Sequence, residues 1–510
     1  MISSQPERTP SVEISNQSKL GGNGRERMRV LIVTPEICDS RVLAAGGGYS
    51  PCVKAGGLAD VCGLLLDSLT GADTEVHVAM PNFRSLLDVG PNGHSHLLHL
   101  CEDREFCYRR TVYEGDGEAN LRASLAFQRD VIQYIIPQYR PHLVHCHDWM
   151  TGLVPAAARA MGIRSIFTLH NLHDMRTTLA HIEDRGLDSA GFWQDLYYDS
   201  FPGSYESTRD GNAVSLLASG ILAADRMNTV SGSFLHELAY GLHGVPWQVA
   251  DAVRGKMAAG HAQGILNSLP DNRFPATDPA IACQYDAFSA VDGKAANKAE
   301  FQRVLGLDQR PDAPLFFWPS RLDPHQKGCG LLAEILEDIC ATHADCGIQI
   351  AFVADGPYAP KIKEMATRDS LAGRVAAKPF HDNLSRLGYA AADFLLMPSS
   401  FEPCGLAQMI GLRYGSLPVV HATGGLRDTV VSLNAVENTG NGFAFENHDA
   451  NGLRWAIDRA VDFHHLPFEE KIRNMQRIMS EAEAAYRPAA MTNQYNELYH
   501  NILATESTTL

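Results

Sequence analysis

Short apolar runs that alternate with helical segments are the feature that most restricts the fold of this chain. The first run, residues 29 to 34, reads Arg-Val-Leu-Ile-Val-Thr and is followed by a glycine-rich loop and a helical segment from 61 to 69. A continuous apolar run of this length is typical of a strand buried on both faces of a parallel sheet. The alternation therefore predicts an α/β fold with doubly wound parallel sheets.

The alternation occurs twice along the chain, which predicts two Rossmann-like domains. Later runs of the first half lie at 75–80, 143–147, 165–170 and 226–231, and those of the second half at 315–318, 348–353, 374–377, 394–397 and 417–421. A chain of 510 residues is also too long for one ordinary core. We place the domains at 28–266 and 267–487, after a disordered leader at 1–27, and expect a helix within 488–510 to pack back on the first domain.

Composition restricts the partners and the location of the protein. A formal net charge of -16 argues against a nucleic-acid or membrane-surface role. No apolar run approaches the ~20 residues of a membrane span, and the N-terminus lacks a signal-peptide core, so we expect a cytoplasmic protein. The eleven cysteines form no CxxC pair and are interpreted mostly as reduced core thiols, not as a zinc ribbon or a disulfide framework.

The glycine-rich loop after the first run has the layout of a phosphate-binding turn. Gly56 and Gly57 allow a ligand to approach the backbone, and Lys54 could add positive charge. The loop is neither a Walker A motif nor GxGxxG, which also argues against a nicotinamide-dependent dehydrogenase. A plain turn between strand and helix remains the alternative.

Two further polar sites follow predicted strands of the first domain. His145 and His147 are two apart, so they share one face of a strand, and Asp148 comes next. His170 and Asn171 end the following run. Such residues could bind zinc, close hydrogen bonds at a ligand site or be structural, and no further His or Cys ligand pair lies nearby.

The second domain has three comparable turns. Arg321 and Lys327 lie in one short loop, where both could bind a diphosphate. Glu402 follows the strand at 394–397, and Gly405 permits a tight turn before the next helix. Thr423 and Gly424 open another glycine turn. Each turn taken alone could be an ordinary surface loop.

Taken together, six motifs resemble those of bacterial glycogen synthases and plant starch synthases, which form glycosyltransferase family 5. In chain order they are Lys54-Ala-Gly-Gly-Leu58, His145-x-His-Asp-Trp149, His170-Asn171, Ser320-Arg-Leu322 with Gln326-Lys-Gly328, Phe401-Glu-Pro-Cys-Gly-Leu406 and Thr423-Gly-Gly-Leu-x-Asp-Thr429. The resemblance covers roughly residues 28 to 500. It implies the GT-B fold, in which two Rossmann-like domains face a deep interdomain cleft.

The resemblance also implies a retaining transfer of glucose from ADP-glucose, or from UDP-glucose, to an α-1,4-glucan. It assigns catalysis to Glu402, Lys327, Arg321 and His170. It assigns substrate binding to Lys54, Gly56, Gly57, Asp60, Asp148, Asn171, Phe380, Cys404, Gly405, Leu406, Thr423 and Gly424. No cofactor or metal is expected, because Arg321 and Lys327 would neutralise the diphosphate.

The sequence also departs from the family pattern. Ala407 stands where the family commonly has Thr, Phe380 where Tyr is usual, and Ala218 where Lys is usual. The segment from 81 to about 115, which in the family helps to hold the glucan, is short. A glycosyltransferase with a non-glucan acceptor and a non-catalytic glucan-binding homologue therefore remain alternatives, and the choice between ADP and UDP stays open.

Overall fold

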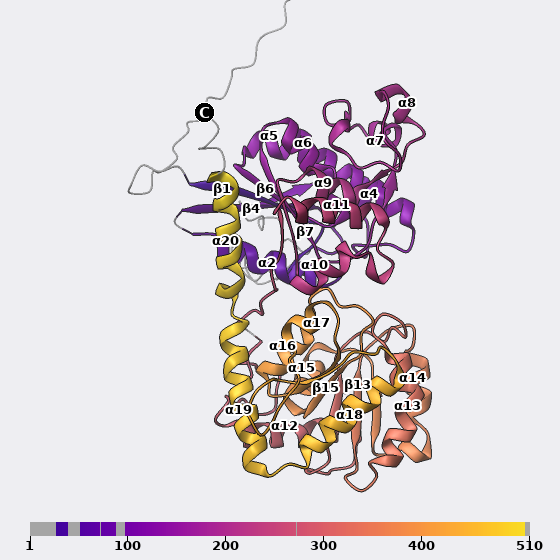
Figure 1. Cartoon of the computed structure of the whole chain (residues 1–510), viewed down its shortest axis with the longest axis vertical. Coiled ribbons are helices and arrows are strands. Elements are labelled where there is room, and N and C mark those ends of the chain that lie inside the picture. The colour runs from indigo at the N-terminus through magenta and orange to yellow at the C-terminus, as the bar shows by residue number, and fades with distance from the viewer. Residues whose placement is uncertain (1–26, 39–51, 72, 88–96, 272, 505–510) are drawn as a thin grey trace, which may run out of the picture.

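The structure is a computed structural model that describes residues 27–38, 52–71, 73–87, 97–271 and 273–504. Most of the predicted leader and residues 39–51 lie outside the described part of the chain. The described chain forms an N-terminal domain, which ends with β11 (Ala262–Gly264), and a C-terminal domain, which begins with α12 (Ala290–Leu305). Figure 1 shows them as two lobes, one above the other.

The N-terminal domain is built on a seven-stranded parallel sheet in the order β11-β10-β7-β6-β1-β4-β5. Its strands are β1 (Met28–Val33), β4 (Thr74–Pro81), β5 (Leu98–Cys101), β6 (Leu143–His147), β7 (Arg164–Leu169), β10 (Arg226–Thr229) and β11. The central strands are buried on both faces, as their continuous apolar runs require. A short hairpin, β2 (Ile37–Cys38) with β3 (Cys52–Val53), and a second short antiparallel pair, β8 (Arg176–Thr177) with β9 (Val214–Ser215), lie outside the sheet.

Helices cover both faces of this sheet (Figure 1). They are α2 (Gly57–Leu69), α3 (Arg104–Cys107), α4 (Gly117–Asp130), α5 (Ile136–Tyr139), α6 (Val154–Ala160), α7 (Leu179–Asp184), α8 (Tyr205–Arg209), α9 (Leu216–Ala223), α10 (Gly232–Ala239) and α11 (Trp247–Ala258). Helix α2 starts directly at the glycine loop and buries Leu58, Val61 and Leu65. The glycine loop is therefore fixed between β3 and a well-packed helix.

The C-terminal domain repeats the architecture with six parallel strands in the order β14-β13-β12-β15-β16-β17. The strands are β12 (Leu315–Trp318), β13 (Gln349–Val353), β14 (Val375–Lys378), β15 (Phe394–Met397), β16 (Leu417–His421) and β17 (Phe443–Phe445). The helices after α12 are α13 (Cys329–Thr342), α14 (Ala359–Ala366), α15 (Asp382–Ala391), α16 (Ala407–Arg413), α17 (Gly424–Thr429), α18 (Ala450–His464) and α19 (Phe468–Ala485). Two doubly wound sheets are thus present.

The last helix, α20 (Pro488–Ala504), leaves the C-terminal domain and packs on the N-terminal domain against α2 (Figure 1). Its Tyr495 and Tyr499 are fully buried there. The chain therefore passes between the domains twice, and the two passages meet where the N–H of Leu269 donates to the carbonyl of Tyr486 at 3.0 Å. These two neighbouring segments are the covalent connection about which the domains could move.

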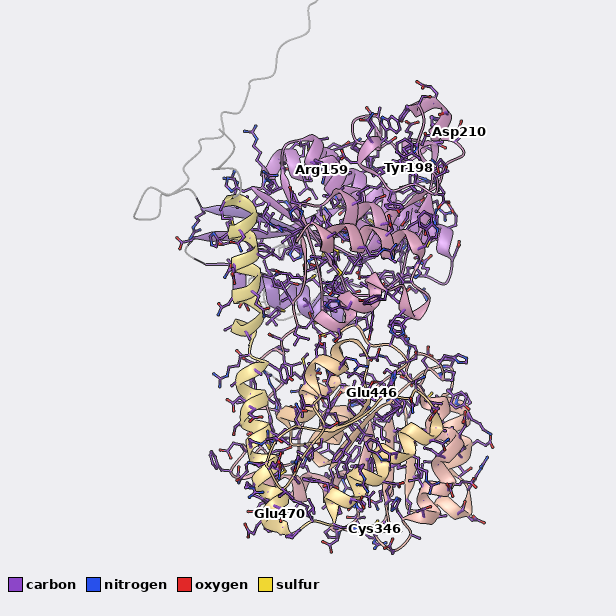
Figure 2. The ribbon with its side chains drawn as sticks, viewed as in Figure 1. Arg159, Tyr198, Asp210, Cys346, Glu446 and Glu470 are labelled. Carbon is purple, nitrogen blue, oxygen red and sulfur yellow. A yellow bond between two sulfur atoms is a disulfide. The ribbon has the colours of Figure 1, made fainter. Side chains whose placement is uncertain are left out.

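Side chains fill the layers between sheets and helices in both lobes (Figure 2). Among the described residues, no helix has the length and apolar character needed to cross a membrane. The loops at the carboxyl ends of both sheets meet between the two lobes.

Candidate active site between the two domains

The strand order of each sheet reverses at one point, and ligands of open α/β sheets bind beside such points. In the N-terminal domain the reversal lies between β1 and β6, and in the C-terminal domain between β12 and β15. The connections that lead from these four strands to the next helices contain Gly56, Asp148, Lys327 and Glu402. Motifs far apart in the sequence are thus placed at the two positions where this fold class binds ligands.

The glycine loop is held in place by Glu36, a residue that the sequence interpretation missed. The Glu36 carboxylate accepts hydrogen bonds from the N–H groups of Ala55 at 2.6 Å and Gly56 at 3.0 Å. The hydroxyl of Tyr113 donates to the same carboxylate at 3.2 Å. Burial raises the pKa of Glu36, and the three hydrogen bonds oppose that rise. A carboxylate three residues after a buried strand was the available hint.

Lys54 is not free in this structure, because its Nζ lies 2.6 Å from a carboxylate oxygen of Asp60. Both side chains are partly exposed, so solvent screens the pair and it contributes little to stability. The N–H groups of Ala55 and Gly56 are likewise taken by Glu36. Lys54 and the N–H groups of Ala55 and Gly56 are therefore already engaged within the protein.

Asp148 joins the ends of β6 and β7. Its carboxylate accepts the backbone N–H of His170 at 2.7 Å and the side-chain amide of Asn171 at 2.8 Å. Burial raises the pKa of Asp148 to about 7. Its backbone has φ 58° and ψ 180°, a region used almost only by glycine, at a cost of about 1–3 kcal/mol. Strain held by a buried network is common at functional sites.

Lys327 and Glu402 form the central pair of the C-terminal domain. Lys327 Nζ lies 2.6 Å from Glu402 Oε2, and the Ser399 hydroxyl donates to the same oxygen at 3.1 Å. Both charged side chains are mostly buried. Because the loops after β12 and β15 neighbour each other across the sheet reversal, a cation and a carboxylate from positions 75 residues apart come into contact.

The loop of Glu402 is packed so closely that only glycine fits beside it. A Cβ at Gly424, where φ is +45°, would lie 2.1 Å from the carbonyl oxygen of Glu402. A Cβ at Gly425 would lie 2.1 Å from the carbonyl oxygen of Cys404. Gly405 has φ +72°, which a side chain rarely adopts. The two glycine turns therefore fit together and fix Glu402.

Contacts between the domains bring the N-terminal and C-terminal motifs face to face. A Cβ at Gly57 would meet Leu406 Cδ1 at 3.5 Å, so the glycine loop and the loop after β15 are neighbours. The Ser231 hydroxyl donates to the Pro403 carbonyl at 2.6 Å. The N–H of Ser233 donates to Asp428 at 2.9 Å. The carboxyl ends of the two sheets thus point at each other.

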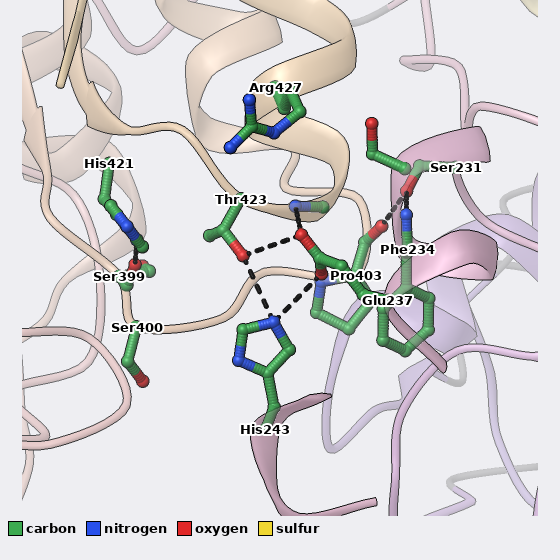
Figure 3. Close-up of polar contacts among 12 residues, drawn as sticks. Ser231, Phe234, Glu237, His243, Ser399, Ser400, Pro403, His421, Thr423 and Arg427 are labelled. Carbon is green, nitrogen blue, oxygen red and sulfur yellow. Dashed lines mark hydrogen bonds and ion pairs between the residues drawn. The ribbon is translucent and has the colours of Figure 1, made fainter. Parts of the chain in front are cut away.

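Glu237 of α10 is the second site residue that the sequence interpretation missed. Its carboxylate accepts the N–H of Gly424 at 2.7 Å and the hydroxyl of Thr423 at 3.1 Å (Figure 3). His243 lies 3.1 Å from its other oxygen. Burial alone would raise the pKa of Glu237, but these hydrogen bonds outweigh burial and lower it. A turn predicted to bind an external anion therefore holds a carboxylate of the other domain.

Two predicted residues lie apart from these contacts. The Arg321 side chain is 60% exposed and bonds within its own loop, to Gln326 at 3.1 Å and Asp323 at 3.7 Å. Phe380, in the loop after β14, is 54% exposed and keeps an open aromatic face. Both residues are available to a ligand, and neither touches the Lys327–Glu402 pair in the described contacts.

The histidines considered as zinc ligands have other partners. Both ring nitrogens of His145 lie 2.7 Å from hydroxyls, those of Tyr499 and Thr168. His147 Nδ1 lies 2.9 Å from His170 Nε2. Burial lowers the pKa of His145 and of His170 to about 3, so both rings are neutral. The described part of the chain contains no group of three or more His, Cys, Asp or Glu residues able to hold a metal.

The cysteines differ from the sequence interpretation at two places. Cys38 and Cys52 form a disulfide that closes the hairpin of β2 and β3 beside the glycine loop, and the other nine cysteines are free thiols. Cys404, to which the resemblance assigns substrate binding, is buried, and burial raises its pKa to about 12. The spacing of cysteines in the sequence cannot reveal this disulfide, because Cys38 and Cys52 come together only when β2 and β3 pair.

Comparison with known proteins agrees with this geometry. Residues 29–246 match the family described as starch synthase catalytic domain, and residues 313–462 match glycosyl transferases group 1. A glycogen synthase of Geobacillus thermodenitrificans is 30% identical over 507 residues, which cover 92% of this chain and 99% of the relative. Glycogen synthase 2 of Geobacter sulfurreducens is 33% identical over 464 residues, with 82% and 91% covered.

Among solved structures, the catalytic domain of starch synthase IV from Arabidopsis thaliana, bound to ADP and acarbose, has a TM-score of 0.77. It is 25% identical, and the match covers 94% of this chain and 100% of that one. The GT-B fold predicted from the sequence is thereby confirmed. The chain belongs to the glycogen and starch synthase family of glycosyltransferases.

Proposed function

We propose that the protein transfers glucose, with retention of configuration, from ADP-glucose to the non-reducing 4-hydroxyl of an α-1,4-glucan. The observation that carries the proposal is the contact of Lys327 with Glu402 at the sheet reversal, opposite the glycine loop of the other domain. A mostly buried cation and a carboxylate at this position suit a ligand that has both phosphates and sugar hydroxyls.

In the proposed reaction, charge grows on the diphosphate as the glycosidic bond breaks. Lys327 and Arg321 stabilise this charge. Lys327 is mostly buried, and a fixed cation in a water-poor site is effective because it needs no reorganisation. Glu402 accepts hydrogen bonds from glucose hydroxyls, and neutral His170 contacts the sugar near the anomeric carbon. The acceptor attacks from the face that the diphosphate leaves, and a diphosphate oxygen takes its proton. No cofactor is part of this proposal.

In this scheme the donor must replace contacts that the protein makes with itself. Lys327 is paired with Glu402 and Lys54 with Asp60. We propose that the diphosphate draws both lysines away from these carboxylates when it binds, which leaves Glu402 free to meet the sugar. Phe380 offers an aromatic face on which the adenine can stack.

The choice of ADP-glucose is supported by the relative that was solved with ADP. The testing experiment measures release of ADP from ADP-glucose and of UDP from UDP-glucose in parallel, with glycogen or maltotriose as acceptor. Acceptor-dependent release of ADP is expected. Release of UDP alone would show that UDP-glucose is the donor. Release from neither nucleotide sugar would contradict the proposal and favour a binding-only homologue.

The same assay tests the role of Lys327. Lys327→Ala should lower kcat by at least about 10²-fold, because the leaving group loses a fixed cation and Glu402 loses its partner. Lys361→Ala is the matched control, since Lys361 forms an exposed pair with Glu364 on α14. Equal activity of the two variants would contradict the assigned role.

A different acceptor is the second candidate function, favoured by the short segment from 81 to 115. The structure describes β5 and α3 there but not residues 88–96. Sizing of the products made from labelled donor and short maltooligosaccharides separates the candidates, because a ladder of longer chains supports the glucan. Turnover without any elongation would support a non-glucan acceptor.

The cytoplasmic location stays a prediction that cell fractionation can test.

A further inference from the structure

His147 lies behind His170 and has no place in the chemistry proposed so far. It ends β6, is fully buried, and places its Nδ1 2.9 Å from Nε2 of His170. A hydrogen bond between two neutral imidazoles contains one proton, so one ring donates and the other accepts. Which ring donates decides what His170 offers to a ligand on its other side.

The surroundings of the other ring nitrogen of His147, Nε2, show which of the two rings donates the hydrogen bond. His147 Nε2 is buried and has no hydrogen-bond partner among the described residues. If Nε2 carried the proton, a buried donor would be unsatisfied, which is rarer and more costly than an unused acceptor lone pair. The proton of His147 therefore lies on Nδ1, and His147 donates to His170 Nε2.

The ring of His147 is held in this orientation by its neighbour. The His145 ring centroid lies 4.1 Å from that of His147. Thr168 donates its hydroxyl proton to Asn228 at 2.6 Å, so its oxygen accepts the proton of His145 Nε2, and Tyr499 donates to His145 Nδ1. Because His145 has both nitrogens engaged, it offers no partner to His147.

His170 is thereby left with its own proton on Nδ1. None of the described residues forms a hydrogen bond with His170 Nδ1, and the side chain is partly exposed, unlike those of His145 and His147. Its backbone N–H is fixed by Asp148 at 2.7 Å, so the ring cannot move far from the end of β7. His170 Nδ1–H is a fixed donor available to an oxygen atom.

We propose that His147 is a positioning residue that fixes His170 as the Nδ1–H tautomer and so presents one N–H donor to a hydroxyl oxygen of the transferred glucose. The contact with glucose rests on the proposed function, whereas the tautomer does not. We expect this donor to bind the sugar more strongly in the transition state than in the ground state, so its loss should affect kcat more than KM.

Two variants of His147 separate hydrogen bonding from packing. His147→Phe keeps an aromatic ring but removes the donor, and should lower kcat about tenfold or more with KM for ADP-glucose changed less than twofold. His147→Asn places an amide N–H near the position of Nδ1, and should restore most of the lost kcat. Equal losses in both variants, with unchanged thermal midpoints, would overturn the proposal.

Nitrogen NMR of the wild-type protein with ¹⁵N-labelled histidine tests the tautomer without any turnover. The His170 resonances are identified by their loss in His170→Asn. A protonated Nδ1 and an unprotonated Nε2 are expected for His170, and a protonated Nε2 would overturn the proposal whatever the kinetics of the two His147 variants. If no donor is turned over, the proposed function fails while the NMR result still decides the role of His147.

Discussion

Asp148 combines a strained backbone with a buried carboxyl group, and both follow from its place between two strands. Its N–H donates to the Thr168 carbonyl at 3.1 Å, and its carboxylate holds the N–H of His170 and the amide of Asn171. The positive φ turns the side chain toward these donors. The strained backbone of Asp148 therefore lowers local stability but fixes the orientation of the His170–Asn171 turn.

The raised pKa of Asp148 makes its contribution to stability depend on pH. Between about pH 4 and pH 7 the folded protein retains a proton on Asp148 that the unfolded chain has released, so this contribution falls as pH rises and levels off above 7. Relative to Asp148→Asn, the wild-type free energy of unfolding should fall by at most about 4 kcal/mol across this window. Urea unfolding at pH 5 and pH 8 measures it, and a constant difference would contradict the prediction.

Gly424→Ala tests the close packing of the two glycine turns. The new Cβ would lie 2.1 Å from a backbone oxygen of Glu402, and φ is +45°, so the Glu402 loop must shift. We expect a loss of at least about 2 kcal/mol of stability together with lower activity. Gly255→Ala, within α11, is the control, because no atom lies within 4 Å of a Cβ at this position. This substitution should stabilise the protein by about 0.5–1 kcal/mol. Similar unfolding midpoints for both variants would refute the packing argument.

Candidate site residues could be proposed from the sequence where local chemistry marked them. Lys327 and Glu402 stand next to glycine turns at strand ends, and the structure brings these two into contact. Glu36 and Glu237 were missed because their roles depend on partners 19 and 187 positions away. A carboxylate on a helix such as α10 usually faces solvent, and only the meeting of two domains gives Glu237 its partners.

At the scale of elements, buried parallel strands were the most predictable part of the fold. The apolar runs at 143–147 and 394–397 coincide with β6 and β15. The strands β5, β11 and β17 were not predicted, because they are three or four residues long and lie at sheet edges. Edge strands contact one neighbour only, so a mixed polar pattern is tolerated there. The alternation predicted two doubly wound sheets even with these strands missing.

The disulfide between Cys38 and Cys52 stabilises the hairpin that leads into the glycine loop. Closing a loop of about 15 residues stabilises a fold by about 3 kcal/mol in the chain-entropy description. Reductant should therefore lower the thermal midpoint of the wild-type protein but not that of the Cys38→Ser, Cys52→Ser double variant. Thiol titration in denaturant should find nine thiols before reduction and eleven after it.

Cys346→Ser is the control for this experiment. Cys346 is a free, half-buried thiol at the end of the C-terminal domain away from the N-terminal domain (Figure 2). The midpoint of this variant should still respond to reductant as the wild-type midpoint does. Eleven thiols before reduction would show that the disulfide is absent from the purified protein.

At the scale of the whole molecule, polar contacts between α10 and α17 hold the two domains together. Glu237 and Ser233 bond Thr423, Gly424 and Asp428 across the interface. Because the two passages of the chain lie together at Leu269 and Tyr486, we expect the domains to rotate about that point when a nucleotide sugar binds.

Small-angle scattering tests this rotation. ADP-glucose should reduce the radius of gyration of the wild-type protein, and Glu237→Ala should increase it in the absence of donor because the contacts of Thr423 and Gly424 are lost. Glu481→Ala, which removes an exposed pair with Arg477 on α19, should leave the scattering unchanged. Identical curves for all samples with and without donor would refute the rotation.

The course of α20 sets an order of assembly during translation. Tyr499 and Tyr495 complete the interior of the first domain through bonds to His145 and Asn228, which precede them by 354 and 267 residues. Domains usually fold in the order in which they leave the ribosome. Here the first domain to be synthesised lacks two buried tyrosines until α20 emerges, so the half of the molecule that starts folding first is completed only after the second domain has been synthesised.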